Sequence, residues 1–550
     1  MKQTLGVSLV AAMIAASAFA QPSVSGLQNN YSYLVPGAAN YGIAEGSIFI
    51  IYGKNIGPAT LAQQTAYPLN KNLGGVTISV TVGGVTTTAI PYYVSAGQIA
   101  AILPAATPVG TGTITVAYGG QTSAAAPIVV VQSAFGILTM NNAGSGAAAA
   151  FDSKNSFLGP NNAANPGDTI VLWGTGIGPA SGDETNLQTP TNLSNINTQI
   201  WIGGKSATVS YRGRSAYPGL DQINVVIPGG VSGCSVGLVV QNGNYVSNFV
   251  SIPVAASGRT CSDPTSSSVV DLSSLLNKPT VSYGIVGLSR TTASTAPISV
   301  GGITIPGQTT TTESASGTFI RLTNAQLTAN YGQLSQSSFG SCIVTTYIGK
   351  PTTATATPFT LLDAGNISLN GPGGTKQLQK QQGFYSADLG TNYIGNGGAF
   401  TFTGSGGTDV GGFTTNLNVT NPVKWTNIDT LPTNIPRAQG VTVTWTGGDA
   451  ASTVEITGLS LYATSTDTST AVISSFVCTE KASAGTFTVP SYVLLALPVS
   501  GIAGLPAGAS FAVGNLAVGN VSNLVPFTAT GLDFGYATWD VISSKSVNYQ

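Results

Sequence analysis

The sequence predicts an all-β protein built from two tandem antiparallel β-sandwiches of immunoglobulin size, followed by a larger β-rich domain. Three observations predict it. Short apolar or alternating stretches recur along the chain and end at Gly, Pro or Asn, which is typical of strands and tight turns. No convincing helical period lies between them, and one block of the pattern occurs twice.

Composition narrows the class of function. Of 550 residues, 42% are apolar and only 7% are charged, with a net charge of −1. The chain therefore has material for cores but no basic field that would attract nucleic acid or an anionic membrane. It contains no histidine, which excludes Ser-His-Asp and Cys-His catalysis and histidine zinc sites.

The first 20 residues have the pattern of a signal peptide. Lys2 precedes an apolar stretch over residues 5–16, and Ala18-Phe19-Ala20 has the form of an A-x-A cleavage site. We expect cleavage after Ala20. The expected destination is the periplasm, the cell surface or the medium.

A repeat occupies the region up to residue 257. Residues 46–53 match residues 167–174, and residues 56–59 match residues 177–180, both at an offset of 121. Three further blocks follow in the same order. We predict one sandwich over residues 21–135 and a second over residues 136–257.

The glycine-rich stretch "LWGTGIGPASG" lies inside the repeat and has the spacing of a nucleotide-binding loop. Such a loop needs a third glycine and a following helix. Pro179 stands where that glycine belongs, no helical period follows, and the sister copy has Lys54 and Asn55 in the loop. We interpret the glycines as strand-to-loop corner residues.

These residues carry a resemblance. "GDTIVLWGTGIGP", a later V/I-G-G block, "LDQINVVIP" and a closing strand resemble a secreted immunoglobulin-like domain family of Acidobacteria, similar in style to the IPT/TIG class. The second copy, over about 140–257, matches best; in the first copy Tyr52 replaces Trp173. The resemblance implies an extracellular β-sandwich of undefined activity, with no catalytic residues to carry over.

The four cysteines fit an oxidising compartment. Neither CxxC spacing nor a metal-ligand pattern is present. Three pairings are possible. Proximity along the chain favours Cys234–Cys261 and Cys342–Cys478.

Residues 258–280 are Ser-rich and are predicted to be a linker, with a short helix near residues 269–276. Beyond it, residues 281–550 resume the β pattern without copying the sandwiches, as one domain or two. The apolar stretch 491–513 is interrupted by Pro498 and Pro506, so we predict strands and turns there rather than a membrane span.

The carboxylates are the candidate acids, bases and metal ligands. Asp183 and Glu184, in a Gly/Thr/Asn loop, are a weak Ca²⁺ candidate because no D-x-D-x-D-G pattern surrounds them. Five other aspartates lie beside glycine or in turns, where we expect them to cap the backbone: Asp363, Asp388, Asp409, Asp449 and Asp533.

The tryptophans are the candidate ligand platform. Trp173 and Trp201 are expected in sandwich cores, whereas Trp425 and Trp539 have more polar neighbours. An exposed ring on a β surface can stack on a sugar, although core packing is the default for a tryptophan in a strand.

The sequence thus favours a secreted or cell-envelope protein with a structural or adhesive role, without catalytic activity and without a cofactor. The alternative is a polysaccharide-binding protein that uses the C-terminal domain; a carboxylate-based hydrolase is a third hypothesis. Extracellular polysaccharide and surface proteins are the partners considered, and neither nucleic acid nor a membrane span is expected.

Overall fold

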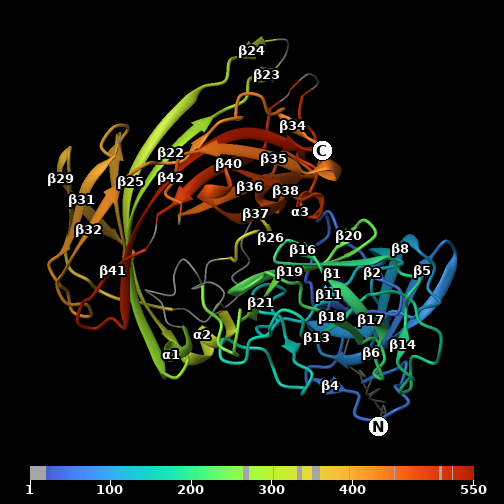
Figure 1. Ribbon diagram of the computed structural model, residues 1–550. Coiled ribbons are helices and arrows are strands. Elements are labelled where there is room, and N and C mark those ends of the chain that lie inside the picture. Colours follow the sequence, from blue (N-terminus) through green and yellow to red (C-terminus); the bar gives the residue numbers. More distant parts are fainter. Residues whose placement is uncertain are drawn as a thin grey trace, which may run out of the picture.

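The computed structural model describes residues 20–263, 272–300, 303–330, 337–349, 359–395, 397–450, 452–506, 509, 511–522 and 524–550. The predicted signal peptide, except Ala20, and residues 264–271 of the predicted linker lie outside the described residues. The described chain is almost wholly β, which confirms the predicted fold class. Two sandwiches pack beside a large curved sheet (Figure 1).

The first sandwich closes around an apolar core. Buried residues alternate with partly buried ones along β5 and in the second half of β8, so one face of each strand meets the core. Its strands are β1 (Ser23–Asn29), β2 (Ile43–Ala44), β3 (Ile48–Lys54), β4 (Ala62–Gln63), β5 (Thr77–Val82), β6 (Val85–Val94), β7 (Gln98–Ile102), β8 (Gly110–Tyr118), β9 (Gln121–Thr122) and β10 (Ala126–Val131).

The long strand β6 belongs to both sheets of this sandwich. Its first half pairs with β5, and its second half pairs with β7. One sheet therefore runs β1-β3-β7-β6 and the other runs β6-β5-β8-β10-β2.

The second sandwich repeats this strand order, but its two sheets share no strand among the described residues. Sheet β13-β18-β17 corresponds to β3-β7-β6, and β15-β19-β21 corresponds to β5-β8-β10. Its strands are β11 (Gly136–Ile137), β12 (Ala150–Phe151), β13 (Thr169–Thr175), β14 (Thr191–Asn192), β15 (Thr198–Ile202), β16 (Lys205–Ser206), β17 (Thr208–Arg214), β18 (Asp221–Val226), β19 (Gly233–Asn242), β20 (Tyr245–Val246) and β21 (Val250–Val254).

The remaining chain builds one continuous sheet. Its path is β26-β37-β36-β40-β42-β22-β25-β30-β29-β28-β31-β32, so the last strand of the chain lies parallel to the first strand of this region. Apart from this sheet, β23 pairs only with β24 among the described strands, and β33, β35 and β38 form a small sheet of their own. The strands of the whole region are β22 (Thr280–Ser294), β23 (Ile298–Val300), β24 (Ile303–Ile305), β25 (Thr309–Thr323), β26 (Cys342–Ile348), β27 (Thr360–Leu361), β28 (Ile367–Gly371), β29 (Gly374–Gln381), β30 (Phe384–Gly390), β31 (Gly398–Gly404), β32 (Phe413–Val419), β33 (Lys424–Trp425), β34 (Asn434–Ile435), β35 (Val441–Thr446), β36 (Thr453–Ala463), β37 (Val472–Lys481), β38 (Thr486–Val489), β39 (Gly501–Ile502), β40 (Gly514–Val521), β41 (Val525–Phe527) and β42 (Phe534–Tyr549).

Within the described residues, three short α-helices accompany it: α1 (Leu272–Leu275), α2 (Asn324–Asn330) and α3 (Ser491–Leu495). The helix α1 lies where the sequence predicts one. The helix α3 begins the apolar stretch 491–513, where only strands and turns were expected. Among the described residues, no helix has the length and apolar character needed to cross a membrane.

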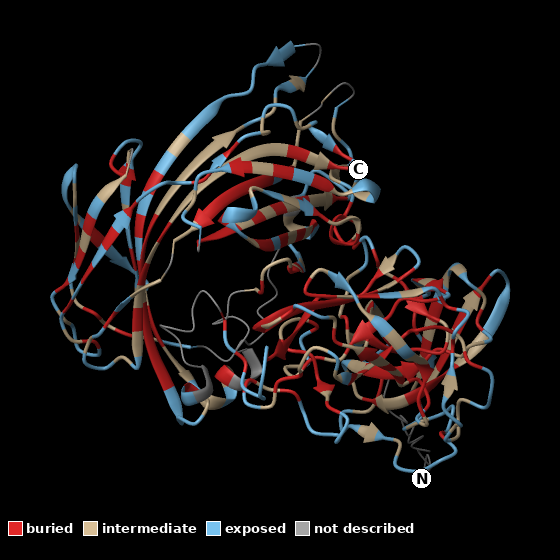
Figure 2. Cartoon of the chain, viewed as in Figure 1, coloured by how far each residue is buried: buried red, intermediate tan, exposed pale blue. Residues whose placement is uncertain are grey.

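Buried residues fill the centres of both sandwiches and the two ends of the large sheet (Figure 2). One of these cores crosses a predicted domain boundary, because Val239, Val246 and Phe249 of the second sandwich belong to the same cluster as Tyr492 of α3. The second sandwich and the large sheet therefore share buried apolar contacts.

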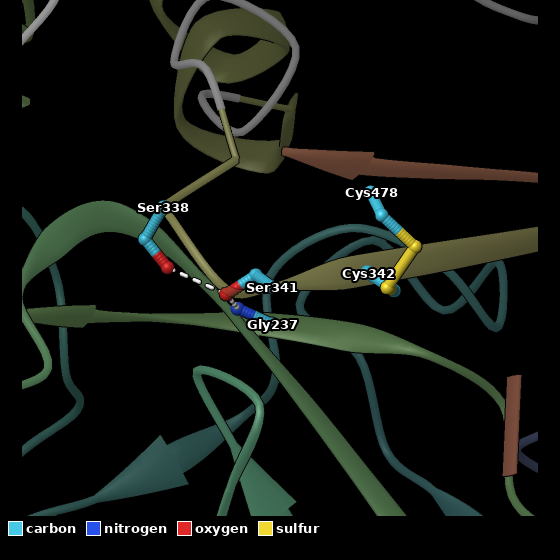
Figure 3. The surroundings of a disulfide bond; sticks show 5 residues. All are labelled: Gly237, Ser338, Ser341, Cys342 and Cys478. Atoms are coloured by element: carbon cyan, nitrogen blue, oxygen red, sulfur yellow. Dashed lines mark hydrogen bonds between the residues drawn. A yellow bond between two sulfur atoms is a disulfide. The ribbon is translucent and has the colours of Figure 1, made fainter. Parts of the chain in front are cut away.

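Both predicted disulfides form. Cys234 bonds Cys261, and Cys342 bonds Cys478 as a directly paired couple on β26 and β37. Figure 3 shows the second bridge beside the junction with the second sandwich, where the Gly237 amide donates to Ser341 Oγ at 3.2 Å. The Ser341 hydroxyl also contacts the Ser338 hydroxyl at 2.5 Å.

Candidate functional site

The tryptophans proposed as a sugar platform are in the core, so that prediction is wrong. Trp425 and Trp539 each expose only 4% of their surface. Their ring N–H groups are satisfied inside the protein, by Asn427 Oδ1 at 2.8 Å and by the Asn418 carbonyl at 3.1 Å. The polar neighbours in the sequence point away on the opposite strand face, and neither ring is available to a ligand.

Trp201 also departs from its expected place. It is only partly buried and lies outside the sandwich core, on the side that faces the large sheet. Its ring stacks on Tyr492 of α3, with centroids 4.9 Å apart. Trp201 is therefore a junction residue between the second sandwich and the C-terminal region.

The weak metal candidates have other partners. Asp183 accepts hydrogen bonds from the amide and hydroxyl of Thr185 and from Asn186 Nδ2, which lowers its pKa. Glu184 accepts from the Ala105 amide of the first sandwich at 2.8 Å. Of the residues that the structure describes, no three His, Cys, Asp or Glu side chains come together in a way that could hold a metal ion.

Four of the five turn aspartates accept hydrogen bonds from backbone amides, and Asp449 accepts one from a hydroxyl. Asp388 accepts from Gly390 within its own turn, whereas Asp533 accepts from Ser282 on a distant strand. Asp363 accepts from Gly365 and Lys380, and these hydrogen bonds hold its pKa well below the usual range. Asp409 accepts from the Asp363 amide and Asp449 from the Thr420 hydroxyl.

One carboxylate pair has raised pKa values. Burial raises the pKa of Glu455 on β36, and the charge of Asp540 on β42 raises it further. Burial likewise raises the pKa of Asp540, which accepts from the Ser289 hydroxyl at 2.6 Å. Both carboxylates lie on the sheet face opposite to the two cores, with β40 between their strands.

The glycine-rich loop contains a buried ion pair rather than a phosphate site. Asp221 Oδ2 accepts from the amides of Gly176 and Ile177, at 2.7 and 2.9 Å. Arg214 Nε lies 3.4 Å from Asp221 Oδ1, and its Nη1 donates to the Gly46 carbonyl of the first sandwich at 2.7 Å. An internal carboxylate thus occupies the amides that a phosphate would need, and the loop joins the two sandwiches.

A tyrosine-lined pocket of about 400 Å³ opens on the first sandwich. A regular strand would send adjacent side chains to opposite faces. A bulge in β6, between Pro91 and Tyr93, breaks that alternation, so Tyr92 and Tyr93 both line the pocket. The full lining, called the tyrosine pocket below, is Asn30, Tyr31, Ile48, Leu61, Gln63, Tyr92, Tyr93 and Ala100.

Two neighbouring segments complete the tyrosine pocket. The chain after β1 supplies Asn30 and Tyr31, and the short strand β4 supplies Gln63 with the exposed Leu61 beside it. Strand β4 pairs with the end of β6, through Gln63 opposite Tyr93, which fixes the width of the opening.

The tyrosine pocket carries no side-chain charge at neutral pH. Burial raises the pKa of Tyr31 to about 12 and raises that of Tyr93 above its usual value. Gln98 Nε2 donates to the Tyr93 hydroxyl at 2.7 Å. Neutral phenols and amides bind by stacking and hydrogen bonding, and they offer neither a nucleophile nor a general acid or base at pH 7.

The tyrosine pocket is not among the predicted sites, because only tryptophans count among the predicted ligand-stacking residues. The signal present in the chain was the pair Tyr92-Tyr93 in a strand pattern, together with Tyr31 at the end of another. Adjacent aromatic residues in a strand indicate either a buried face or a bulge, and only the register distinguishes the two.

No family model matches the chain, and no curated protein matches it. Solved structures to which it is similar include the SGBP-B protein of a Bacteroides ovatus mixed-linkage glucan utilization locus in complex with a mixed-linkage heptasaccharide, at 12% identity and TM-score 0.19, covering 40% of this chain and 46% of that one. Another is SGBP-B of a Bacteroides uniformis complex xyloglucan utilization locus, at 10% identity and TM-score 0.16, covering 86% and 97%.

Domains 5–6 of the S-layer protein SbsC are a third, at 16% identity and TM-score 0.15, covering 42% of this chain and 98% of that one. The match covers less than half the length of the first structures, 46% in the case of the Bacteroides ovatus protein. At these identities and TM-scores the likeness assigns no function.

Proposed function

We propose that the protein is a non-catalytic adhesive protein of the cell exterior that binds an uncharged polysaccharide in the tyrosine pocket. The pocket itself carries this proposal. Its volume of about 400 Å³ falls in the range of small-ligand sites and holds one or two sugar rings. The sequence suggests polysaccharide binding by the C-terminal domain as an alternative; we propose that the first sandwich binds the polysaccharide instead.

The lining supplies the two kinds of contact that a sugar needs. Tyrosine rings offer flat apolar surface for the C–H face of a pyranose, at little cost in side-chain entropy. The amides of Asn30 and Gln63 can each donate to and accept from vicinal hydroxyls.

Because the lining of the tyrosine pocket has no charged side chain, it favours uncharged glycans. A carboxylated or sulfated glycan entering this pocket would lose hydration without gaining a cation, which is unfavourable. A neutral glucan or mannan loses no charge hydration. We therefore expect binding that depends little on ionic strength.

The rest of the molecule supports an extracellular role. Two disulfides are typical of proteins in an oxidising compartment. The sandwich junction is held by hydrogen bonds such as Ile48 N to Thr175 Oγ1 at 2.8 Å and Leu69 N to Thr185 O at 2.7 Å. These bonds connect the two sandwiches directly, so the domain that carries the pocket is joined to the rest of the chain.

Affinity electrophoresis of the mature chain in gels containing neutral or anionic polysaccharides tests the proposal. We expect retardation by at least one neutral polysaccharide and about a tenfold weaker affinity for the double variant Tyr92→Ala/Tyr93→Ala, equivalent to the loss of about 1.4 kcal/mol of stacking. Tyr347→Ala, which removes an exposed tyrosine on β26, is the matched control and should bind normally.

Two results would contradict the proposal. One is a wild-type chain that no neutral polysaccharide retards. The other is a folded double variant that binds as tightly as the wild type, which would place the binding surface elsewhere.

A further inference from the structure

A small amphipathic hairpin stands at the end of the long strands β22 and β25. In it, β23 pairs with β24 through Ile298 opposite Ile305 and Val300 opposite Ile303. Paired residues share a face, so all four apolar side chains lie on one side. Ser299 and Thr304 pair on the other side, with their hydroxyls 2.9 Å apart.

The apolar side is exposed. The four side chains expose between 42% and 72% of their surface, and Ile303 exposes most. Figure 2 shows β24 as exposed, at a distance from the red centres of the cores. A group of exposed β-branched residues at a projecting end indicates an interaction surface rather than scattered apolar residues.

A hydrophilic, uncharged stem carries this tip. The ends of β22 and β25 are joined by hydroxyl pairs, Thr292 with Thr311 at 3.2 Å and Ser294 with Thr309 at 3.0 Å. No Asp, Glu, Lys or Arg occurs over residues 291–312. Along β22 and β25 the nearest charges are Arg290 and Glu313, which pair with each other at 3.4 Å at the base of the stem. On the neighbouring strand, Lys545 lies opposite Ser294 and donates to backbone carbonyls at 2.9 and 2.6 Å.

We propose that this tip inserts its apolar face into a lipid surface. The residues disfavour a protein partner, because the tip lacks the Trp, Tyr and Arg that dominate protein interfaces. They also disfavour a second copy. Four half-exposed aliphatic side chains offer roughly 200 Å² of apolar area, against the roughly 800 Å² per partner of a stable interface.

A lipid surface matches the observed pattern. It needs apolar area without directional partners, and it tolerates hydroxyls but not charges at the depth of the tip. Contact through uncharged residues alone should not depend on the charge of the headgroups.

The tip and the tyrosine pocket lie far apart. In Figure 1, β23 and β24 stand at the top of the molecule, whereas β4 and β6 lie near the N-terminus at the opposite end. A chain held by its tip would therefore present the pocket away from the lipid. The lipid contact goes beyond the proposed function and stands independently of it.

Co-sedimentation of the mature chain with sucrose-loaded phosphatidylcholine vesicles tests the inference. We expect weak, saturable binding that is unchanged when phosphatidylglycerol is added or when NaCl is raised to about 1 M, a concentration that screens surface charge. The variant Ile303→Ser/Ile305→Ser should bind at least tenfold more weakly. The control Ser299→Ala/Thr304→Ala changes the opposite face and should bind as tightly as the wild type.

Three outcomes would overturn it: no sedimentation of the wild type with vesicles, equal binding by the serine variant, or a wild-type dimer that the serine variant dissociates. The vesicles carry no glycan, so the result does not depend on whether the tyrosine pocket binds sugar.

Discussion

The glycine-rich loops of the two sandwiches have similar sequences but differ in the residues that hold them in place. The glycine-rich corners of the two copies share the pattern Ile-Gly-Pro-Ala, yet only the second is held by Asp221; the first copy has Gly97 at the matching position. Arg214 then links that carboxylate to Gly46 of the first sandwich. The same residues thus stabilise a loop and join two domains.

Asp221→Asn should strongly destabilise the second sandwich. The substitution leaves the Arg214 guanidinium buried without its counter-charge, which costs about 3–5 kcal/mol. Hydrogen exchange of backbone amides in β13 and β18 measures this loss. Asp168→Asn, in the exposed pair with Arg259, is the control and should cost less than about 1 kcal/mol. Equal effects of the two variants would argue against the buried pair as the link.

Glu455→Gln should raise the melting temperature at pH 7. Burial and Asp540 raise the pKa of Glu455 in the folded state. A raised folded pKa means that stability is highest below the unfolded value of about 4.3 and falls as pH rises through the folded value. The neutral amide removes that loss, so the variant should exceed the wild type at pH 7 and equal it near pH 3, in melts followed by circular dichroism.

Asp467→Asn tests the sign of this effect. Hydrogen bonds from Ser469 lower the pKa of Asp467. Its stabilising contribution is therefore present above the unfolded pKa and lost in acid, and this variant should melt lower than the wild type at pH 7. A gain at pH 7 for both variants would contradict the assignment.

Local sequence does not decide whether an aromatic residue in a strand is buried in a core or lines a pocket. Trp539 and Tyr92 both occur in strand patterns, yet Trp539 is in a core and Tyr92 lines a pocket. The local alternation around Trp539 does not tell which face meets the core, because that depends on strand pairing far along the chain. Disulfide pairing was predictable because proximity along the chain favoured one pairing out of three.

Alternation of apolar and polar residues predicted the strands, but it did not predict the register in which they pair. Both copies of the repeat carry a bulge in the same strand, between Pro91 and Tyr93 in β6 and between Val209 and Tyr211 in β17. The residue skipped is Tyr92 in the first copy and Ser210 in the second. Only the first copy therefore brings two adjacent tyrosines to one surface, where they line the tyrosine pocket.

The β26–β37 element should depend on its disulfide. Cys342 and Cys478 close a loop of 136 residues. In the chain-entropy model the bond restricts the unfolded chain, so Cys342→Ser/Cys478→Ser should cost about 3–5 kcal/mol. Urea unfolding measures the loss. Cys234→Ser/Cys261→Ser opens a loop of only 27 residues and should cost less; a larger cost for this second pair would contradict the loop-length argument.

The two sandwiches and the large sheet are joined by buried contacts and hydrogen bonds. The sequence located the repeat and the change of pattern near residue 280, but not the path of the large sheet. That path places β42 beside β22 although some 250 residues separate them in the chain. Nothing local specifies such a pairing, since any two alternating strands can pair. The tyrosine pocket and the apolar tip keep opposite positions only if the junctions between the units are stiff.

Trp201→Ala should loosen the junction between the second sandwich and the large sheet. Its ring stacks on Tyr492 of α3, which also contacts β20 and β26, so the truncation removes packing on both sides of the junction. We expect faster hydrogen exchange in α3 and β20, with β13 and β18 unchanged. Trp201→Phe is the matched control. It keeps a ring on Tyr492 and removes a buried indole N–H that lacks a hydrogen-bond partner, so its stability should equal or exceed that of the wild type. Unchanged exchange in α3 of the alanine variant, or an equal loss in both variants, would show that the junction is held by its backbone hydrogen bonds rather than by this stack.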